Sequence, residues 1–153
     1  MVRRSIALIL AAALALSLSP AALAGHGIKI ETEGLDKYTS VGLDLEIGLP
    51  GVPLRPFAEV LGWWSQADTQ PSHVQAGLGA RYYIAAASSG LFAEAKLRYV
   101  STFEEDAEPG TALLAGLGYR ISPGIGSLDL FAVTTLSEHD LLPRYIFGAR
   151  IGF

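Results

Sequence analysis

The chain of 153 residues has no cysteine, so disulfide bonds and lipid attachment to a cysteine are excluded. Charged residues are few, at 17% of the composition, and the bases are outnumbered, with 11 Lys and Arg against 15 Asp and Glu. A net negative chain has little attraction for phosphate backbones, so nucleic acid is not expected as a partner. After the N-terminal segment, no apolar run approaches the roughly 20 residues of a spanning helix. Entry into a bilayer would therefore require a closed β-barrel, in which neighbouring strands satisfy every backbone hydrogen bond.

The N-terminal segment has the pattern of a secretory signal peptide. Arg3 and Arg4 stand before an apolar run at positions 6–18, and Ala22 and Ala24 form a small-residue cleavage site. The alternative, an N-terminal membrane anchor, needs a longer apolar run. We therefore predict that residues 1–24 are cleaved and that residues 25–153 form one domain.

Apolar and polar residues alternate in eight segments between position 28 and the end of the chain. A period of two indicates β-strands with one apolar face, because successive side chains point to opposite sides of a strand. The last segment shows this clearly, with Tyr145, Phe147, Ile151 and Phe153 on one face and Arg150 on the other. The expected strands are residues 28–33, 41–49, 54–64, 74–84, 91–99, 111–121, 128–136 and 145–153. The sequence therefore predicts an all-β fold, an eight-stranded antiparallel up-and-down β-barrel.

Every charged residue in these segments, and Arg144 just before the last of them, is assigned to the face opposite the apolar one. The acids are Glu31, Glu33, Asp44, Glu46, Glu59, Glu94 and Asp129, and the bases are Lys29, Arg55, Arg81, Lys96, Arg98, Arg120, Arg144 and Arg150. Five large aromatic side chains share this face, namely Phe57, Trp63, Tyr83, Phe92 and Phe131. Two barrels fit this alternation: a soluble lipocalin-like carrier with the apolar face inward, and a membrane barrel with that face toward lipid.

Three features favour the transmembrane β-barrel. Strands of nine to eleven residues, which can cross a bilayer at a tilt, recur along the chain. Tyrosine and tryptophan lie toward strand ends on the apolar face, as at membrane interfaces, in Trp64, Tyr82, Tyr99, Tyr119 and Tyr145. Glycine gathers on the charged face, in Gly42, Gly48, Gly77, Gly79, Gly116, Gly118, Gly148 and Gly152. Because the interior of eight strands is only just wide enough for side chains, we predict a lumen plugged by paired ions.

Connection length predicts the orientation, because outer-membrane barrels have short periplasmic turns and longer outer loops. Three short connections are uncharged, whereas the four longer ones together hold eight acids and one base. Their charged residues are Asp36, Lys37, Asp68, Glu104, Glu105, Asp106, Glu108, Glu138 and Asp140. The group from Glu104 to Glu108 offers hard oxygen ligands that could bind a divalent cation and bridge to lipopolysaccharide, although such a charge run is usually just solvated.

By its strand count and its terminal phenylalanine, the chain resembles the small eight-stranded bacterial outer-membrane barrels, such as the transmembrane domain of outer membrane protein A and outer membrane protein X. This resemblance implies a monomer in the outer membrane, in contact with its lipids, whose Phe153 is read by the barrel-assembly machinery. A weaker resemblance, to the YfaZ-type barrels, lies in residues 30–41 with Lys37, Tyr38 and Thr39. It implies no activity.

The segment from Ser137 to Asp140 invites comparison with the lipid A deacylases, small barrels that use a His and a Ser near their last strands. In that family the Ser follows the His by two, a position that Leu141 occupies after His139 here. We therefore predict a solvated polar loop and no catalytic residue. His26 and His73 have no second ligand at metal-binding spacing, so no metal site and no cofactor are predicted.

The sequence thus predicts a structural or surface-interaction barrel of the outer membrane, without enzymatic activity. Three alternatives stay open: a lipid-modifying outer-membrane enzyme, a narrow channel and a soluble lipocalin-like carrier. A requirement for detergent would separate the membrane barrels from the carrier.

Overall fold

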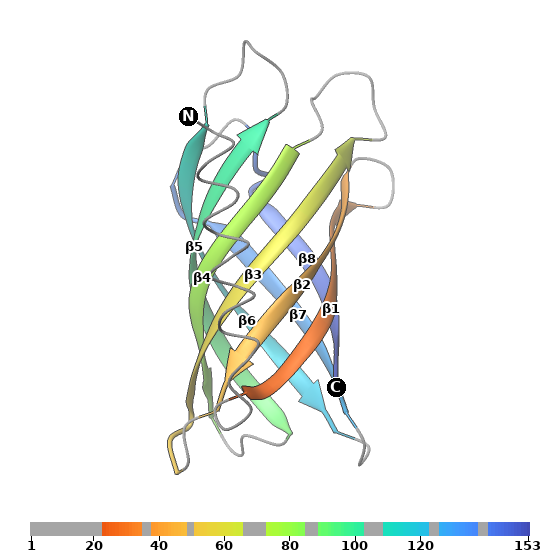
Figure 1. Cartoon of the computed structure of the whole chain (residues 1–153). Helices are drawn as coiled ribbons and strands as arrows, with labels where there is room; N and C mark the ends of the chain where they lie inside the picture. The colour runs from red at the N-terminus through yellow and green to blue at the C-terminus, as the bar shows by residue number, and fades with distance from the viewer. Residues whose placement is uncertain are drawn as a thin grey trace.

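The protein is a closed antiparallel β-barrel of eight strands, seen in a computed structural model (Figure 1). The structure describes residues 23–34, 38–48, 51–65, 73–84, 89–102, 109–122, 126–137 and 141–153. The strands are β1 Leu23–Gly34, β2 Tyr38–Ile47, β3 Leu54–Ser65, β4 His73–Tyr83, β5 Gly90–Thr102, β6 Gly110–Ile121, β7 Ser127–Thr135 and β8 Tyr145–Gly152. The prediction of an all-β, eight-stranded up-and-down barrel is confirmed. Within the described ranges, no helix has the length and apolar character needed to span a membrane.

Pairing between the first and last strands closes the barrel. Gly27 of β1 lies opposite Gly152 of β8, Lys29 opposite Arg150, and the register continues without a break to Thr32. One residue beyond β8, the Phe153 backbone N–H donates to the His26 carbonyl oxygen at 2.9 Å. The terminal phenylalanine is thereby fixed to the first strand.

Strand β1 begins at Leu23, five residues before the predicted start at Ile28. The sequence pattern hides this extension because the polar His26 stands on the outer face, in phase with Ile28, and the glycines at 25 and 27 carry no side chain that could mark the inner face. Leu23 pairs with Ile47 of β2, so the strand crosses the predicted cleavage position after Ala24. Removal of residues 1–24 stays a prediction.

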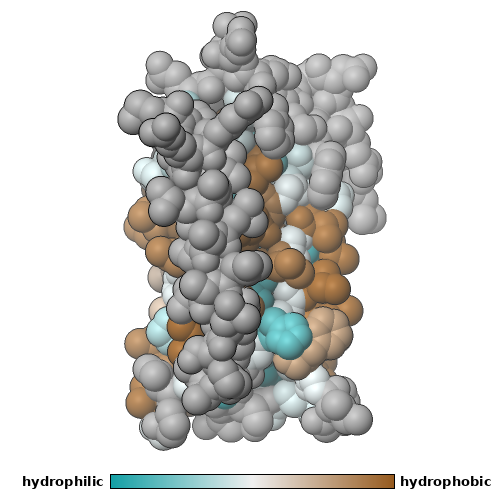
Figure 2. Space-filling model, in the orientation of Figure 1, coloured by the Kyte–Doolittle hydropathy of each residue, from teal (hydrophilic) through white to brown (hydrophobic). Residues whose placement is uncertain are grey.

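The two faces of the sheet have opposite character. Leu43, Leu78 and Leu117 on the outside are 65%, 68% and 62% exposed, whereas twelve charged side chains point inward and are buried. Figure 2 shows hydrophobic residues in brown on the outer surface of the barrel wall. The carrier arrangement, with the apolar face inward, is not the one found. On the outer face Tyr82, Tyr119 and Tyr145 are half exposed near strand ends, as predicted.

One charged residue departs from the predicted inward face. Arg144 lies just before β8 and is exposed, with its guanidinium 5.6 Å from the centre of the Tyr145 ring. The alternation of β8 does not reach it because the chain before the strand turns inward, which buries Leu141 and Leu142. The carbonyl of Arg144 accepts hydrogen bonds from the Thr135 backbone N–H at 2.9 Å and from the Thr134 hydroxyl at 3.0 Å, at the end of β7. The inward assignment of Arg144 was therefore wrong.

Most of the predicted acidic connections fall outside the described residues. These are Asp36, Lys37, Asp68, Glu104, Glu105, Asp106, Glu108, Glu138 and Asp140, together with His139. The barrel has a loop end, where these four charged connections join the strands, and a turn end, where the three uncharged connections and the C-terminus lie (Figure 1). The predicted difference in length fails for the first connection, because β1 ends at Gly34 and β2 begins at Tyr38, a shorter gap than any at the turn end.

Candidate functional site

The inward-facing side chains form three layers along the barrel axis. At the loop end is an apolar layer, which includes Trp63, Val100, Leu114 and Ile146. In the middle is a central ion cluster, defined as Lys29, Glu31, Glu59, Glu94, Lys96 and Arg98. Toward the turn end is a turn-side ion cluster, defined as Asp44, Glu46, Arg55, Arg81, Arg120, Asp129 and Arg150. The layers follow from the alternation of each strand, since every second residue points inward.

The central ion cluster pairs three acids with three bases. Lys29 Nζ lies 2.6 Å from Glu59 Oε2, Arg98 Nη1 donates to Glu31 Oε2 at 2.7 Å, and Lys96 Nζ lies 2.9 Å from Glu94 Oε1. Each of these six side chains is at most 3% exposed. They come from strands β1, β3 and β5, so the cluster ties opposite walls of the barrel together.

In the turn-side ion cluster, the carboxylates of Asp129 and Glu46 each accept two hydrogen bonds from one arginine. Arg120 donates to both oxygens of Asp129, at 2.6 and 2.7 Å, and to both oxygens of Glu46, each at 3.0 Å. Arg81 reaches Glu46 and Asp44 at 2.8 Å each. Arg81 Nε also lies 3.1 Å from Glu94 Oε2, which links this cluster to the central one.

The two clusters together hold six acids and seven bases. Removing a charge from water costs several kcal/mol, and only close, hydrogen-bonded partners offset this cost. Cations also lie over the inward aromatic rings: Arg81 Cζ is 4.2 Å from the Phe57 ring centre, and Lys29 Nζ is 4.6 Å from that of Phe131. These contacts add electrostatic attraction in a site without bulk water. The carboxylates are thus held as ion-pair partners.

Glycine provides the room for this packing at two positions. A Cβ on Gly118 would lie 2.7 Å from Phe92 Cε2, and a Cβ on Gly148 would lie 2.6 Å from Phe131 Cε2. Any larger residue would therefore displace an aromatic ring inside the lumen. The predicted role of inward glycine is confirmed at these positions, as is the inward burial of Phe57, Trp63, Tyr83, Phe92 and Phe131.

The apolar layer at the loop end was only partly anticipated. Leu141 and Leu142, in the segment before β8, pack into this layer although the sequence pattern assigns them to a polar loop. The His73 ring stacks on Trp63, with ring centres 5.8 Å apart and planes at 11°. Adjacent leucines inside an otherwise polar connection are the one sequence signal that could have revealed this cover.

Of the segment from Ser137 to Asp140, the structure describes Ser137 alone. Its Oγ accepts a hydrogen bond from the Leu113 backbone N–H at 2.9 Å. Its proposed neighbours Glu138, His139 and Asp140 lie outside the described residues. Across the described ranges, no group of three or more His, Asp or Glu side chains is arranged to hold a metal ion.

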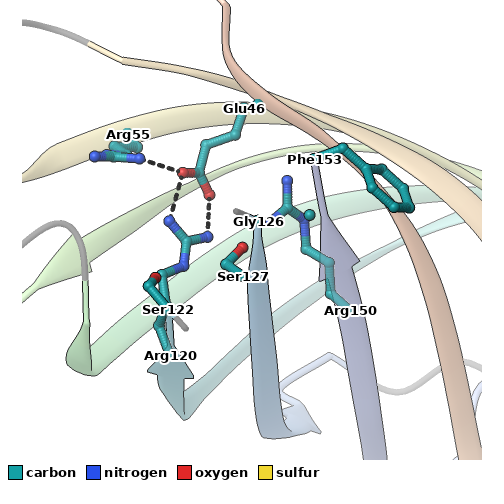
Figure 3. Close-up of a pocket in the computed structure, with 10 residues that line it drawn as sticks. Glu46, Arg55, Arg120, Ser122, Gly126, Ser127, Arg150 and Phe153 are labelled. Atoms are coloured by element: carbon teal, nitrogen blue, oxygen red, sulfur yellow. Dashed lines mark hydrogen bonds and ion pairs between the residues drawn. The ribbon is translucent and has the colours of Figure 1, made fainter. Parts of the chain in front are cut away.

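A cavity of about 240 Å³ lies at the turn end of the lumen. Figure 3 shows Glu46 between Arg55 and Arg120, with Arg150 beside Phe153 on the other side of the cavity. The residues that line it are Gly25, Glu46, Arg55, Arg120, Ser122, Gly126, Ser127, Arg150, Gly152 and Phe153. Sequence reasoning missed this cavity because its wall combines strand ends with residues of turns.

Fold and interior define a closed eight-stranded β-barrel with an apolar exterior and an ion-paired lumen. Comparisons with protein-family models, curated proteins and solved structures give no match for this chain. The resemblance to the small outer-membrane barrels stays a prediction that rests on the strand pattern and on Phe153.

Proposed function

We propose that the protein is a structural barrel of the outer membrane that surrounds a closed, ion-paired core. The apolar exterior carries this proposal. Large exposed hydrophobic residues occur on all eight strands, among them Ile30, Leu43, Leu54, Leu78, Leu97, Leu117, Leu130 and Phe147. Soluble monomers rarely expose contiguous apolar patches beyond a few hundred Å², whereas a barrel wall in lipid requires such a belt.

The closed barrel supports the proposal in a second way. In hydrocarbon, every backbone polar group must be satisfied within the protein, and pairing of β1 with β8 leaves the sheet without an open edge. The strands have 8 to 13 residues, which suits a tilted crossing of the bilayer. The half-exposed tyrosines near strand ends fit the two interfaces.

In this proposal the turn end faces the periplasm and the loop end faces outward. Phe153, which is exposed and bonded to β1, is the proposed signal for the barrel-assembly machinery. Outer-membrane lipids contact the apolar exterior, and any recognition of divalent cations or lipopolysaccharide belongs to the acidic loops. Stiffness, provided by the ion clusters, is the proposed role of the lumen.

The proposal is tested by whether the folded protein partitions into detergent or into water. Protein lacking residues 1–24, so that their apolar run cannot contribute, is expected to enter the detergent phase of a Triton X-114 separation. It is also expected to migrate faster on a gel before heating than after heating. A folded chain that stays in the aqueous phase as a monomer would contradict the membrane assignment.

The closed lumen predicts little or no ion conductance. The central ion cluster crosses the lumen with side chains at most 3% exposed, which leaves no continuous solvent path through it. Single-channel recording in planar bilayers should therefore show no steady conductance, with incorporation of the folded barrel checked by its heat-sensitive gel band. A steady wild-type current of porin size would show that the ion pairs open, and would exclude a purely structural role.

A further inference from the structure

The side chains that line the cavity at the turn end have a net positive charge, although the whole chain is net negative. Three arginine side chains line it, Arg55, Arg120 and Arg150, against one acidic side chain, Glu46. Over the whole turn-side ion cluster, four arginines face the three carboxylates of Asp44, Glu46 and Asp129. The excess base of the lumen therefore lies at this end.

Glu46 cannot neutralise all three arginines of the cavity. Its Oε1 accepts from Arg55 at 2.9 Å and from Arg120 at 3.0 Å. Its Oε2 accepts from Arg81 at 2.8 Å, from Arg120 at 3.0 Å and from the Tyr83 hydroxyl at 3.2 Å. With five donors on two oxygens, this carboxylate has no capacity left for Arg150.

Arg150 carries a buried donor without an acceptor. The side chain is 2% exposed; its Nε donates to Asp44 Oδ1 and its Nη1 to Asp129 Oδ2 at 3.3 Å. Its Nη2 is buried and has no hydrogen-bond partner among the described residues. A Cβ on Gly25, which lines the cavity, would lie 3.8 Å from this nitrogen. An unsatisfied charged donor at this depth is costly, and a bound acceptor would remove the cost.

The remaining wall adds neutral donors. Ser122 and Ser127 bring hydroxyl groups from the two ends of the β6–β7 connection, and Gly126 turns the chain there with a φ of +92°. The Phe153 main-chain oxygen also lies near Gly25, so an anion would sit toward the arginines rather than toward that oxygen. Planar guanidinium groups bind tetrahedral oxyanions through paired N–H donors.

We propose that this cavity is a binding site for a free, phosphate-sized oxyanion. Arg150 Nη2 is the inner donor, Arg55 and Arg120 supply the flanking charges, and the hydroxyls of Ser122 and Ser127 complete the shell. Arg55 is the outermost of the three arginines, with 19% of its side chain exposed. The cavity opens at the turn end, so the anion would come from the compartment that this end faces. The proposal extends beyond a structural role and holds whichever membrane surrounds the barrel.

The test is a titration of the folded protein with inorganic phosphate, in a phosphate-free maltoside detergent, followed by calorimetry. We expect saturable binding in wild type and about tenfold weaker binding in Arg55→Gln, because one charge-assisted hydrogen bond is lost. Arg55 is suited to substitution since Glu46 keeps Arg81 and Arg120 as partners. The matched control is Arg144→Gln, which removes an exposed arginine at the loop end and should leave affinity unchanged. Absence of saturable binding in wild type, or equal affinity in wild type and Arg55→Gln, would overturn the site.

A second measurement needs no variant. Phenylglyoxal modifies accessible arginines, and mass spectrometry should find that phosphate protects Arg55 but leaves Arg144 reactive; equal modification of Arg55 with and without phosphate would overturn the site. A parallel titration with dihexanoyl phosphatidate distinguishes a lipid headgroup from a free anion. A response confined to the phosphatidate would overturn the free-anion assignment.

Discussion

Glu59→Gln is expected to lower the free energy of unfolding by about 3–5 kcal/mol, because it leaves buried cations without their partner. Glu59 bonds to Lys29 Nζ at 2.6 Å and to Arg98 Nε, and all three side chains are buried. The substitution preserves side-chain size, so packing changes little while the central ion cluster becomes three bases against two acids. Urea unfolding in detergent micelles, followed by tryptophan fluorescence and by the heat-sensitive gel band, measures the loss.

Two companion variants show that the loss comes from charge pairing. Glu33→Gln, at a partly exposed position near the loop end of β1, is the matched control and should cost less than about 1 kcal/mol. The double variant Lys29→Gln with Glu59→Gln restores the charge balance and should lose less stability than the two single changes added together. If Glu59→Gln proved as stable as Glu33→Gln, the lumen would be solvated rather than locked by ion pairs.

Most of this fold could be predicted from the sequence, because one physical rule, the alternation of side chains across a strand, decides both where the strands lie and which way their side chains point. Of the fifteen charged residues assigned to the inner face, twelve are buried inside the barrel, and Arg55 joins them through its ion pair with Glu46. The prediction for Arg144 was wrong because the rule applies only within a strand, and β8 begins one residue later. The extra length of β1 was missed for a related reason, since glycine carries no side chain that could show the alternation.

The ion pairs themselves could not be predicted from alternation. Period two fixes which face a residue occupies, but partners on different strands depend on the stagger between strands around the barrel. Arg150 and Asp44 are 106 positions apart and meet because β8 pairs with β1, which pairs with β2. The cavity also depends on barrel closure, because it lies where the turn-end residues of β1, β2, β3, β6, β7 and β8 meet. Only the closed barrel brings these residues together.

Leu78→Arg is expected to lower the free energy of unfolding in a bilayer by roughly 2–4 kcal/mol, the cost of an arginine on the lipid face near the midplane. Leu78 lies in the middle of β4, is 68% exposed, and has Ala58 and Leu97 opposite it on the neighbouring strands. Neither neighbour can pair with a guanidinium. In water the same change at so exposed a position would be nearly neutral, within about 0.5 kcal/mol.

Ile121→Arg is the depth-matched control for this test. Ile121 also points outward but stands at the turn end of β6, where an arginine can reach the headgroups and should cost only about 0–1 kcal/mol. The measurement is urea unfolding of both variants and wild type in bilayers of one lipid composition. Because the two substitutions introduce the same charge on the same face, their difference reports depth in hydrocarbon alone. Equal stabilities of the Leu78 and Ile121 variants would show that no hydrocarbon surrounds the middle of the barrel, and the apolar belt would then need a protein partner.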